Sequence, residues 1–175
     1  MMGYTHALGG VASLWLLYPL GVLTLDATAG NLGVMVAFAV LGALLPDLDS
    51  RRSTLTSLKV AGLSLPPVFY PFGHRGVLHS LAGWAFASCL LAWPVTAYAG
   101  WQPALALSAG WLSHLLLDCC TVTGLPLLWP KPGTVWLLPK FLRVRTATPD
   151  EHGATFLMAA AAMLLFVTAY FGPLM

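Results

Sequence analysis

Residues 80–113 read SLAGWAFASCLLAWPVTAYAGWQPALALSAGWLS, without a single Asp, Glu, Lys, Arg or His. A helix of about 20 apolar residues crosses the hydrocarbon core of a bilayer, so this stretch is long enough for two crossings. Pro94 and the segment GWQP at 100–103 contain residues that interrupt helices. The stretch therefore predicts two membrane helices, near residues 80–97 and 103–120.

Three further runs without charge or histidine lie on either side of this stretch, at residues 7–25, 27–46 and 153–175. The whole chain is 58% hydrophobic and 8% charged, whereas ordinary soluble domains are about half apolar and about 25% charged. We therefore expect an all-α polytopic membrane helical bundle. It should have about five transmembrane helices and form a single domain over residues 1–175.

The basic residues are confined to two loops between the predicted spans. These residues are Arg51, Arg52, Lys59 and Arg75 before the third span, and Lys131, Lys140, Arg143 and Arg145 before the fifth. By the positive-inside rule, both loops and the N-terminus are predicted to be cytoplasmic, in an inner (plasma) membrane protein. Their Pro, Trp and basic residues predict two interfacial loops that contact membrane lipid. A net charge of +2 gives no reason to expect a nucleic-acid substrate.

The first apolar run ends in Asp26-Ala27-Thr28-Ala29, which faintly resembles a signal-peptide cleavage site. No basic segment precedes the run, so we expect it to be retained, with His6 in the mature protein. Cys89, Cys119 and Cys120 offer neither a disulfide framework nor a metal-binding spacing. We interpret these cysteines as small packing residues.

Polar groups gather where the apolar runs end on the predicted cytoplasmic side. His114 and Asp118 are four residues apart, so a helix places them on one face. In a soluble protein such a pair is more often a structural hydrogen bond, but at the end of a membrane helix ionisable groups usually mark function. Asp47 and Asp49 follow Pro46; their carboxylates could bind a cation or simply be solvated at a helix end.

Two histidines flank an arginine in the segment 74–80, HRGVLHS. Imidazole is a common metal ligand, and a guanidinium suits phosphate oxygens, so His74, His79 and Arg75 are candidate site residues. His6 is predicted to lie at the same membrane depth. Glu151 could be a ligand, a general base or a cap for the fifth helix, where an acidic group favours the helix dipole.

Four ordered motifs carry a resemblance to a known family. They are Thr-His at 5–6, LPDLDS at 45–50, HRGVLHS at 74–80 and the pattern SHxxxDxxTxxG at 113–124. Together they resemble the YdjM family, bacterial and archaeal inner-membrane proteins for which metal-dependent hydrolysis has been suggested. That family is distantly similar to zinc-dependent phospholipase C and to the zinc single-strand nucleases.

The resemblance implies a site for two divalent ions, zinc first and manganese or iron otherwise. The implied metal ligands are His6, Asp47, His74, His79, His114 and Asp118. From their positions beside these ligands, we also predict catalytic roles for Asp49, Glu151 and Arg75, and substrate binding by Arg75, Thr121 and Thr123. The soluble enzymes continue with a further His and an HxxxE pair. After Asp118 this chain has a single glutamate, Glu151, and a single histidine, His152, and they are adjacent rather than spaced as an HxxxE pair. We therefore do not expect a third ion.

The expected reaction is hydrolysis of a phosphoester in a phospholipid or a lipid-linked phosphate, at the cytoplasmic face. One alternative is an acyl or amide lipid hydrolase that uses a single zinc ion. Another is a metal-ion transporter or regulator without enzymatic activity. A transporter would place carboxylates at mid-bilayer depth, and the charge-free interiors of the predicted spans argue against it.

Overall fold

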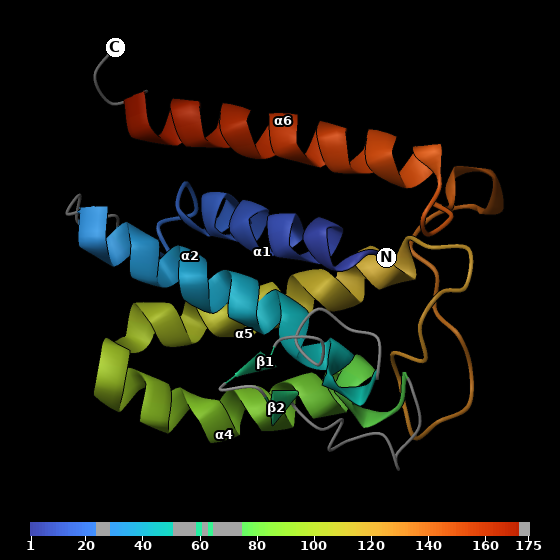
Figure 1. Cartoon of the computed structure of the whole chain (residues 1–175), viewed down its shortest axis with the longest axis horizontal. Coiled ribbons are helices and arrows are strands. Elements are labelled where there is room, and N and C mark those ends of the chain that lie inside the picture. Colours follow the sequence, from blue (N-terminus) through green and yellow to red (C-terminus); the bar gives the residue numbers. More distant parts are fainter. Residues whose placement is uncertain (24–28, 51–58, 61–62, 65–74, 172–175) are drawn as a thin grey trace.

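The computed structural model describes residues 1–23, 29–50, 59–60, 63–64 and 75–171. Five long helices run roughly side by side, with α4 and α6 along the two outer edges of the bundle (Figure 1). The long helices are α1 (Gly3–Leu17), α2 (Ala29–Leu44), α4 (Leu81–Ala99), α5 (Trp101–Cys119) and α6 (Pro149–Phe171). The predicted all-α membrane bundle is therefore confirmed.

Short elements join these helices. The 3-10 helices are η1 (Leu45–Asp49), η3 (Val77–His79) and η4 (Lys140–Leu142). Strands β1 (Lys59–Val60) and β2 (Leu63–Ser64) form a two-residue antiparallel ribbon. The described residues contain no larger sheet, so the ribbon leaves the helical class unchanged.

Five long helices are present, as expected, and some of them qualify as membrane spans by length and composition alone. Within the described ranges, three segments are long and apolar enough to cross a bilayer: Asn31–Asp49, Leu81–Ala99 and Pro149–Thr168. Helix α1 has only 15 residues, because the chain turns after Leu17 and reaches Gly21 with φ +67°. Helix α5 has 19 residues but carries Gln102, His114 and Asp118, which lower its hydropathy.

The break between α4 and α5 lies at Gly100 rather than at Pro94. Gly100 has φ +94°, a conformation that residues with a side chain rarely adopt. Pro94 lies inside α4, which continues to Ala99. Proline removes one helical hydrogen bond, but a membrane helix tolerates it where neighbouring groups compensate.

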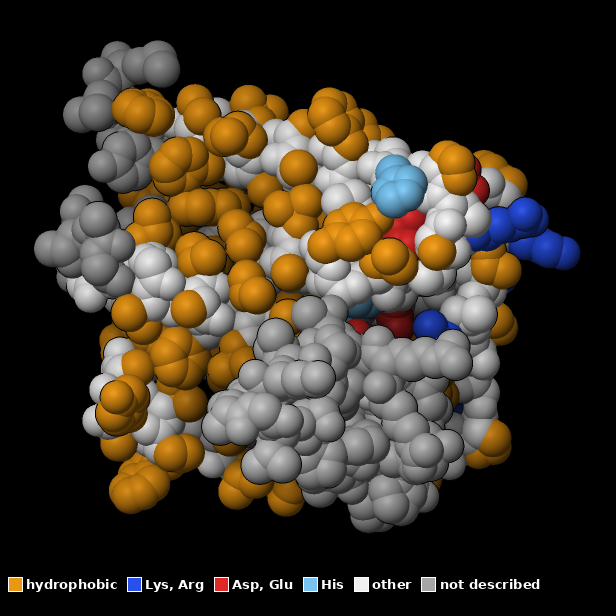
Figure 2. Space-filling model, viewed as in Figure 1, with side chains coloured by type: hydrophobic (Ala, Val, Ile, Leu, Met, Phe, Trp, Pro, Cys, Tyr) orange, Lys and Arg blue, Asp and Glu red, His pale blue; other side chains and the backbone are white. Residues whose placement is uncertain are grey.

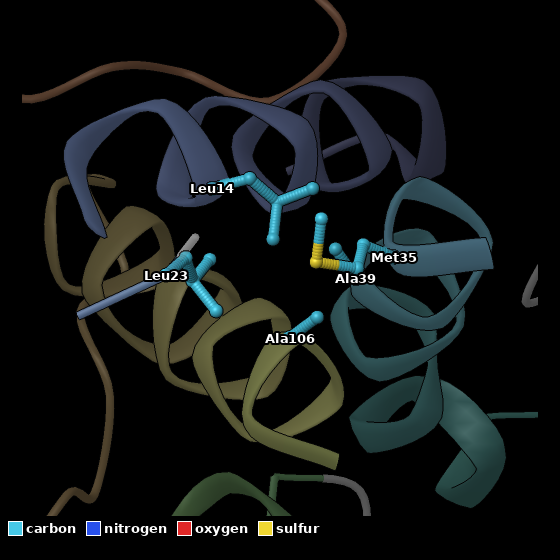
Figure 3. Close-up of a cluster of buried hydrophobic side chains, with 5 residues drawn as sticks. All are labelled: Leu14, Leu23, Met35, Ala39 and Ala106. Carbon is cyan, nitrogen blue, oxygen red and sulfur yellow. The ribbon is translucent and has the colours of Figure 1, made fainter. Parts of the chain in front are cut away.

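Helices α1, α2 and α5 form the centre of the bundle around a small apolar core. The core side chains are Leu14, Leu23, Met35, Ala39 and Ala106 (Figure 3). Helices α2 and α5 approach backbone to backbone: a Cβ added to Gly42 would lie 2.0 Å from the Leu107 carbonyl oxygen, and one added to Gly110 would lie 2.0 Å from that of Ala39. Small residues permit such close helix contacts in membranes.

The alternating direction of the helices brings distant parts of the chain to one end of the bundle. The N-terminus, the C-terminal ends of α2 and α5, and the N-terminal ends of α4 and α6 all lie there (Figure 1). Histidine, acidic and basic side chains gather toward this end, whereas hydrophobic side chains predominate among the described residues over the rest of the face shown in Figure 2. The structure therefore juxtaposes the predicted polar clusters.

Candidate metal centre

Four elements supply the polar residues at this end. Helix α1 carries His6, η1 carries Asp47 and Asp49, and η3 carries His79. The last two turns of α5 carry His114 and Asp118. The sequence sets these positions locally. Pro46 lies in the first turn of η1, and Ser80 caps α4 by accepting a hydrogen bond from Gly83 N at 3.0 Å, which fixes His79 just before the helix.

Two overlapping groups of side chains have their ligand atoms within 4.8 Å of one another. We call Asp47, His79 and His114 the Asp47 triad, and His6, His114 and Asp118 the His6 triad. The three histidines and Asp118 are buried, with at most 2% of each residue exposed. A buried cluster of imidazoles and carboxylates needs a compensating partner, and these donors suit a divalent cation.

Acceptors lie beside the Nδ1 atoms of two of the imidazoles. His114 Nδ1 donates to the Ala43 carbonyl oxygen at 2.7 Å, and His79 Nδ1 lies 3.0 Å from Asp49 Oδ2. A ring with its proton on Nδ1 presents a lone pair on Nε2. With both rings in that form, the two Nε2 lone pairs would face each other across 3.3 Å, an arrangement that suits metal ligands supported by further acceptors.

Ring orientation decides which histidines could share an ion. The rings of His79 and His114 meet at 67°, and their Nε2 separation of 3.3 Å matches the spacing of about 3.3 Å for two nitrogens bound to tetrahedral zinc at 2.0–2.1 Å. The rings of His6 and His114 are instead stacked, with centroids 3.6 Å apart and planes within 15°.

A nitrogen lone pair lies in the plane of its ring, so an ion in one of two nearly parallel planes lies well outside the other. In this arrangement His6 and His114 cannot both bind the same ion. His114 Nε2 has a single lone pair. The angle between the His79 and His114 rings and their Nε2 separation favour the use of that lone pair in the Asp47 triad. His6 and Asp118 are then left as a separate pair, with His6 Nε2 3.4 Å from Asp118 Oδ1.

His6 contacts Asp118 through Nε2. Its Nδ1 is buried without a hydrogen-bond partner among the described residues. Asp118 is in contrast surrounded: its Oδ1 accepts from the amino nitrogen of Met1 at 2.8 Å, and its Oδ2 lies 3.8 Å from His114 Nε2. The Asp118 carboxylate thus has Oδ1 near His6 and Oδ2 near His114.

Arg75 is fixed beside this carboxylate. Its Nη2 lies 3.6 Å from Asp118 Oδ2, and its Nη1 donates to Thr123 Oγ1 at 2.6 Å. The backbone of Arg75 has φ +63°, a conformation that costs about 1–3 kcal/mol in residues other than glycine. Its N–H donates to Asp49 Oδ2 at 2.9 Å. The structure therefore holds a strained arginine at the cluster, as functional sites often do.

Thr121 and Thr123 are linked to the same arginine. Thr121 Oγ1 donates to the Asp118 carbonyl oxygen at 2.7 Å and lies 2.9 Å from Thr123 Oγ1. Backbone hydrogen bonds then tie the loop that follows to the end of α5: Leu137 N donates to Cys119 O, and Val144 N to Cys120 O. The predicted interfacial loop therefore closes the end of the helix that carries Asp118.

Glu151 lies outside both triads. Its carboxylate accepts hydrogen bonds from Met2 N, Thr5 Oγ1 and Ala147 N. Of the readings that the sequence left open, these contacts favour the structural one, in which Glu151 ties the start of α6 to the start of α1. His152 is exposed, and its Nδ1 lies 2.9 Å from Tyr4 Oη.

The remaining predicted ligand, His74, falls outside the described residues. Sequence reasoning missed the Ala43 carbonyl, because a backbone acceptor leaves no trace in residue identity, and it missed Thr5, which stands next to His6 in the first motif.

The cysteines belong to neither triad.

Comparison with known proteins places the chain in a family. The family model described as YdjM inner membrane protein matches residues 1–174. The chain belongs to the YdjM family. It is 41% identical over 100 residues to inner membrane protein YdjM of Escherichia coli K12, a match that covers 55% of this chain and 49% of that protein. The Shigella flexneri protein of the same name gives the same values.

A third relative matches over a longer stretch. The chain is 34% identical over 147 residues to YvsG of Bacillus subtilis 168, covering 82% of this chain and 81% of YvsG. The chain spans about half the length of the Escherichia and Shigella relatives. No solved structure matches it. The predicted family and a membrane location are thus confirmed, and the activity rests on the geometry of the site.

Proposed function

We propose that this protein is a membrane-embedded, metal-dependent hydrolase that cleaves a phosphoester of a lipid or lipid-linked substrate. One observation carries the proposal: three buried histidines, the buried carboxylate of Asp118 and the partly buried carboxylate of Asp47 converge at one end of an apolar helical bundle. Ionisable groups buried at a membrane helix end are costly and usually functional. The described residues contain no other group of this kind.

The ring planes suggest how the residues would divide between two ions. Asp47, His79 and His114 would hold the first ion, and His6 with Asp118 the second. A set of imidazole and carboxylate donors without thiolate favours zinc, with manganese or iron as alternatives. Divalent ions held there would polarise phosphoryl oxygens and lower the pKa of a water molecule toward neutrality.

The other polar residues act on the substrate or on the ligands. Asp49 orients His79 through the ring nitrogen opposite the lone pair, so we assign it to positioning rather than to proton transfer. The Arg75 side chain is 25% exposed and can offer its guanidinium to a phosphate oxygen. Thr121 and Thr123 hold that guanidinium in place. Glu151 positions His6 by fixing the first turn of α1.

The position of the site supports a lipid substrate. Large apolar side chains are exposed along the helices that flank it, among them Leu90, Trp93, Phe156 and Leu164. A water-soluble substrate would not require a site at the end of such a bundle. The basic loops support a cytoplasmic orientation, with the substrate taken from the inner leaflet.

The test combines metal analysis with lipid chemistry. The purified protein in nanodiscs should contain divalent metal, and His114→Ala and Asp118→Ala should lose at least part of it. The matched controls are His152→Ala and Asp150→Asn, because both residues are exposed at the same end of the bundle and outside both triads. These controls should keep the wild-type metal content.

Product analysis by mass spectrometry then identifies the bond that is cleaved. A diacylglycerol or a dephosphorylated lipid supports phosphoester hydrolysis. Release of free fatty acid with one metal ion per protein would replace the proposal with an acyl or amide hydrolase. Unchanged metal content in both site variants would refute the ligand assignment.

A further inference from the structure

A second feature lies beside the metal centre. An apolar groove of about 430 Å³ runs between α1, α5 and α6, a volume within the range of ligand pockets. Its walls include Ala12 and Leu16 of α1, Leu117 of α5, and Met158 and Leu165 of α6. Nothing in the proposed metal centre requires this space.

The groove exists because α6 is held to α1 at two separated places. Near the metal centre, Thr5 Oγ1 donates to Glu151 Oε1 at 3.0 Å and lies 3.0 Å from Thr155 Oγ1. Farther along, Trp15 and Phe166 meet edge to face with centroids 4.6 Å apart. Between these contacts the facing residues are mostly small, such as Ala12, Ala109 and Ala162, so the helices do not close the gap.

The lining is apolar in effect, although it includes two serines. Ser13 Oγ donates to the Gly10 carbonyl oxygen at 2.7 Å, and Ser113 Oγ donates to that of Gly110 at 2.7 Å. Both hydroxyl protons are therefore satisfied within their own helices. The groove offers little to a polar ligand, and a water molecule there would lack the two to four partners that it needs.

One end of the groove adjoins the metal centre. Gly9 lies one helical turn from His6, and Leu117 directly precedes Asp118. The two lining residues also touch, since a Cβ added to Gly9 would lie 2.5 Å from Leu117 Cδ1. From Gly9 to Leu17 the groove extends about 12 Å along α1, at 1.5 Å per residue.

The rims of the groove face outward. Leu16 is 54% exposed and Leu116 is 45% exposed. Helix α6 is one of the segments apolar enough to cross a bilayer. The medium around these rims is then lipid, in which acyl chains are the apolar molecules present at high concentration. A flexible chain suits a narrow, elongated groove whose lining at one end includes Leu117, the neighbour of Asp118 in the sequence.

We propose that the groove holds one acyl chain of a phospholipid whose phosphate lies at His6, Asp118 and Arg75. The identity of the headgroup site rests on the proposed function, whereas the position of the chain rests on the groove itself. Moving an acyl chain from lipid into an apolar groove gains little hydrophobic free energy, because both surroundings are apolar. The groove therefore positions the phosphate, which is where orientation contributes to catalysis.

Photochemical labelling tests the position of the chain directly. The probe is phosphatidylglycerol with a diazirine on one acyl chain, incorporated into nanodiscs with the wild-type protein. After irradiation, peptide mass spectrometry should find label concentrated on groove residues such as Leu16, Leu117, Met158 and Leu165. Label spread evenly over the exposed sides of α4 and α6 would overturn the proposal.

Groove-filling variants provide the matched comparison. Ala160 and Ala161 are adjacent and both exposed, but only Ala161 lines the groove. Ala161→Phe, and Ala12→Phe from the opposite wall, should lower groove labelling about tenfold, and Ala160→Phe should not. If hydrolysis of long-chain lipid is observed, the filling variants should lower its kcat/KM on the order of 10-fold to 100-fold.

Two further measurements separate this inference from the proposed function. Metal content and hydrolysis of a short-chain phosphodiester should be the same in Ala12→Phe, Ala161→Phe and wild type, because neither residue belongs to a triad. A wild-type protein that binds no metal would refute the function, while the labelling pattern would still decide the groove. Equal labelling in the filled and control variants would refute the groove alone.

Discussion

Replacing Gly110 by alanine should weaken metal binding without altering any ligand. The added methyl carbon would lie 2.0 Å from the Ala39 carbonyl oxygen, whereas ordinary contact begins at 3.4 Å. The obstacle is backbone in a tightly packed interface, so α5 must move away from α2 by more than about 1 Å. Gly110 stands one helical turn before His114, which moves with it.

The displacement would break the hydrogen bond that fixes His114. The distance from His114 Nδ1 to the Ala43 carbonyl oxygen is 2.7 Å, and a shift of about 1 Å or more takes it beyond hydrogen-bonding range. Loss of such a supporting acceptor typically costs about 10-fold to 100-fold in metal affinity. We expect a loss of that size in zinc affinity for Gly110→Ala, measured by competition with a chromophoric chelator.

Gly33→Ala is the matched control. Gly33 also lies in a helix of the bundle, and a Cβ added there meets nothing within 4 Å. Alanine favours helix over glycine by about 1 kcal/mol, so this variant should fold at least as well as wild type and bind zinc with unchanged affinity. A helical Gly110→Ala protein with wild-type zinc affinity would refute the link between helix packing and the metal centre.

Three further predictions concern the site itself. Asp49→Asn should lower zinc affinity about 10-fold to 100-fold, because it removes the charge beside His79 Nδ1; an equal loss in Asp150→Asn would point to net charge instead. The free energy of unfolding of Arg75→Gly should exceed that of Arg75→Ala by about 1 kcal/mol, because glycine adopts φ +63° without strain. Arg75→Gly should therefore have the higher melting temperature. The reverse order would show that the backbone there is relaxed. His6→Ala should lose one ion and keep the other, whereas His79→Ala should lose the tighter ion. Metal analysis of the purified proteins distinguishes the two variants. Equal losses in both would argue for a single shared ion.

Much of the fold could be predicted from where charge is missing. Runs without ionisable residues locate the five helices, and their alternating direction predicts that His6, Asp47, His79 and His114 meet at one end. The length of the first helix could not be predicted in the same way. An apolar run does not show that the chain turns after Leu17, so the first run is longer than the helix that it forms.

The arrangement within the site was less accessible to sequence reasoning. The spacing of His114 and Asp118 predicts a shared helix face, and the structure brings both into the His6 triad. Spacing says nothing about ring planes, and these separate His6 from His114. The close approach at Gly42 and Gly110, which brings the Ala43 carbonyl to His114, depends on contacts between helices far apart in the sequence.

The spread of the ligands along the chain has a consequence for biogenesis. The Asp47 triad draws on η1, η3 and α5, so its last member, His114, is synthesised 67 residues after its first, Asp47. While the ribosome is still extending the chain, Asp47 and Asp49 enter the membrane region without their histidine partners, at a cost in solvation. Loading of the proposed cation would therefore follow insertion of α5, which would make it a late step of assembly rather than a nucleus for it.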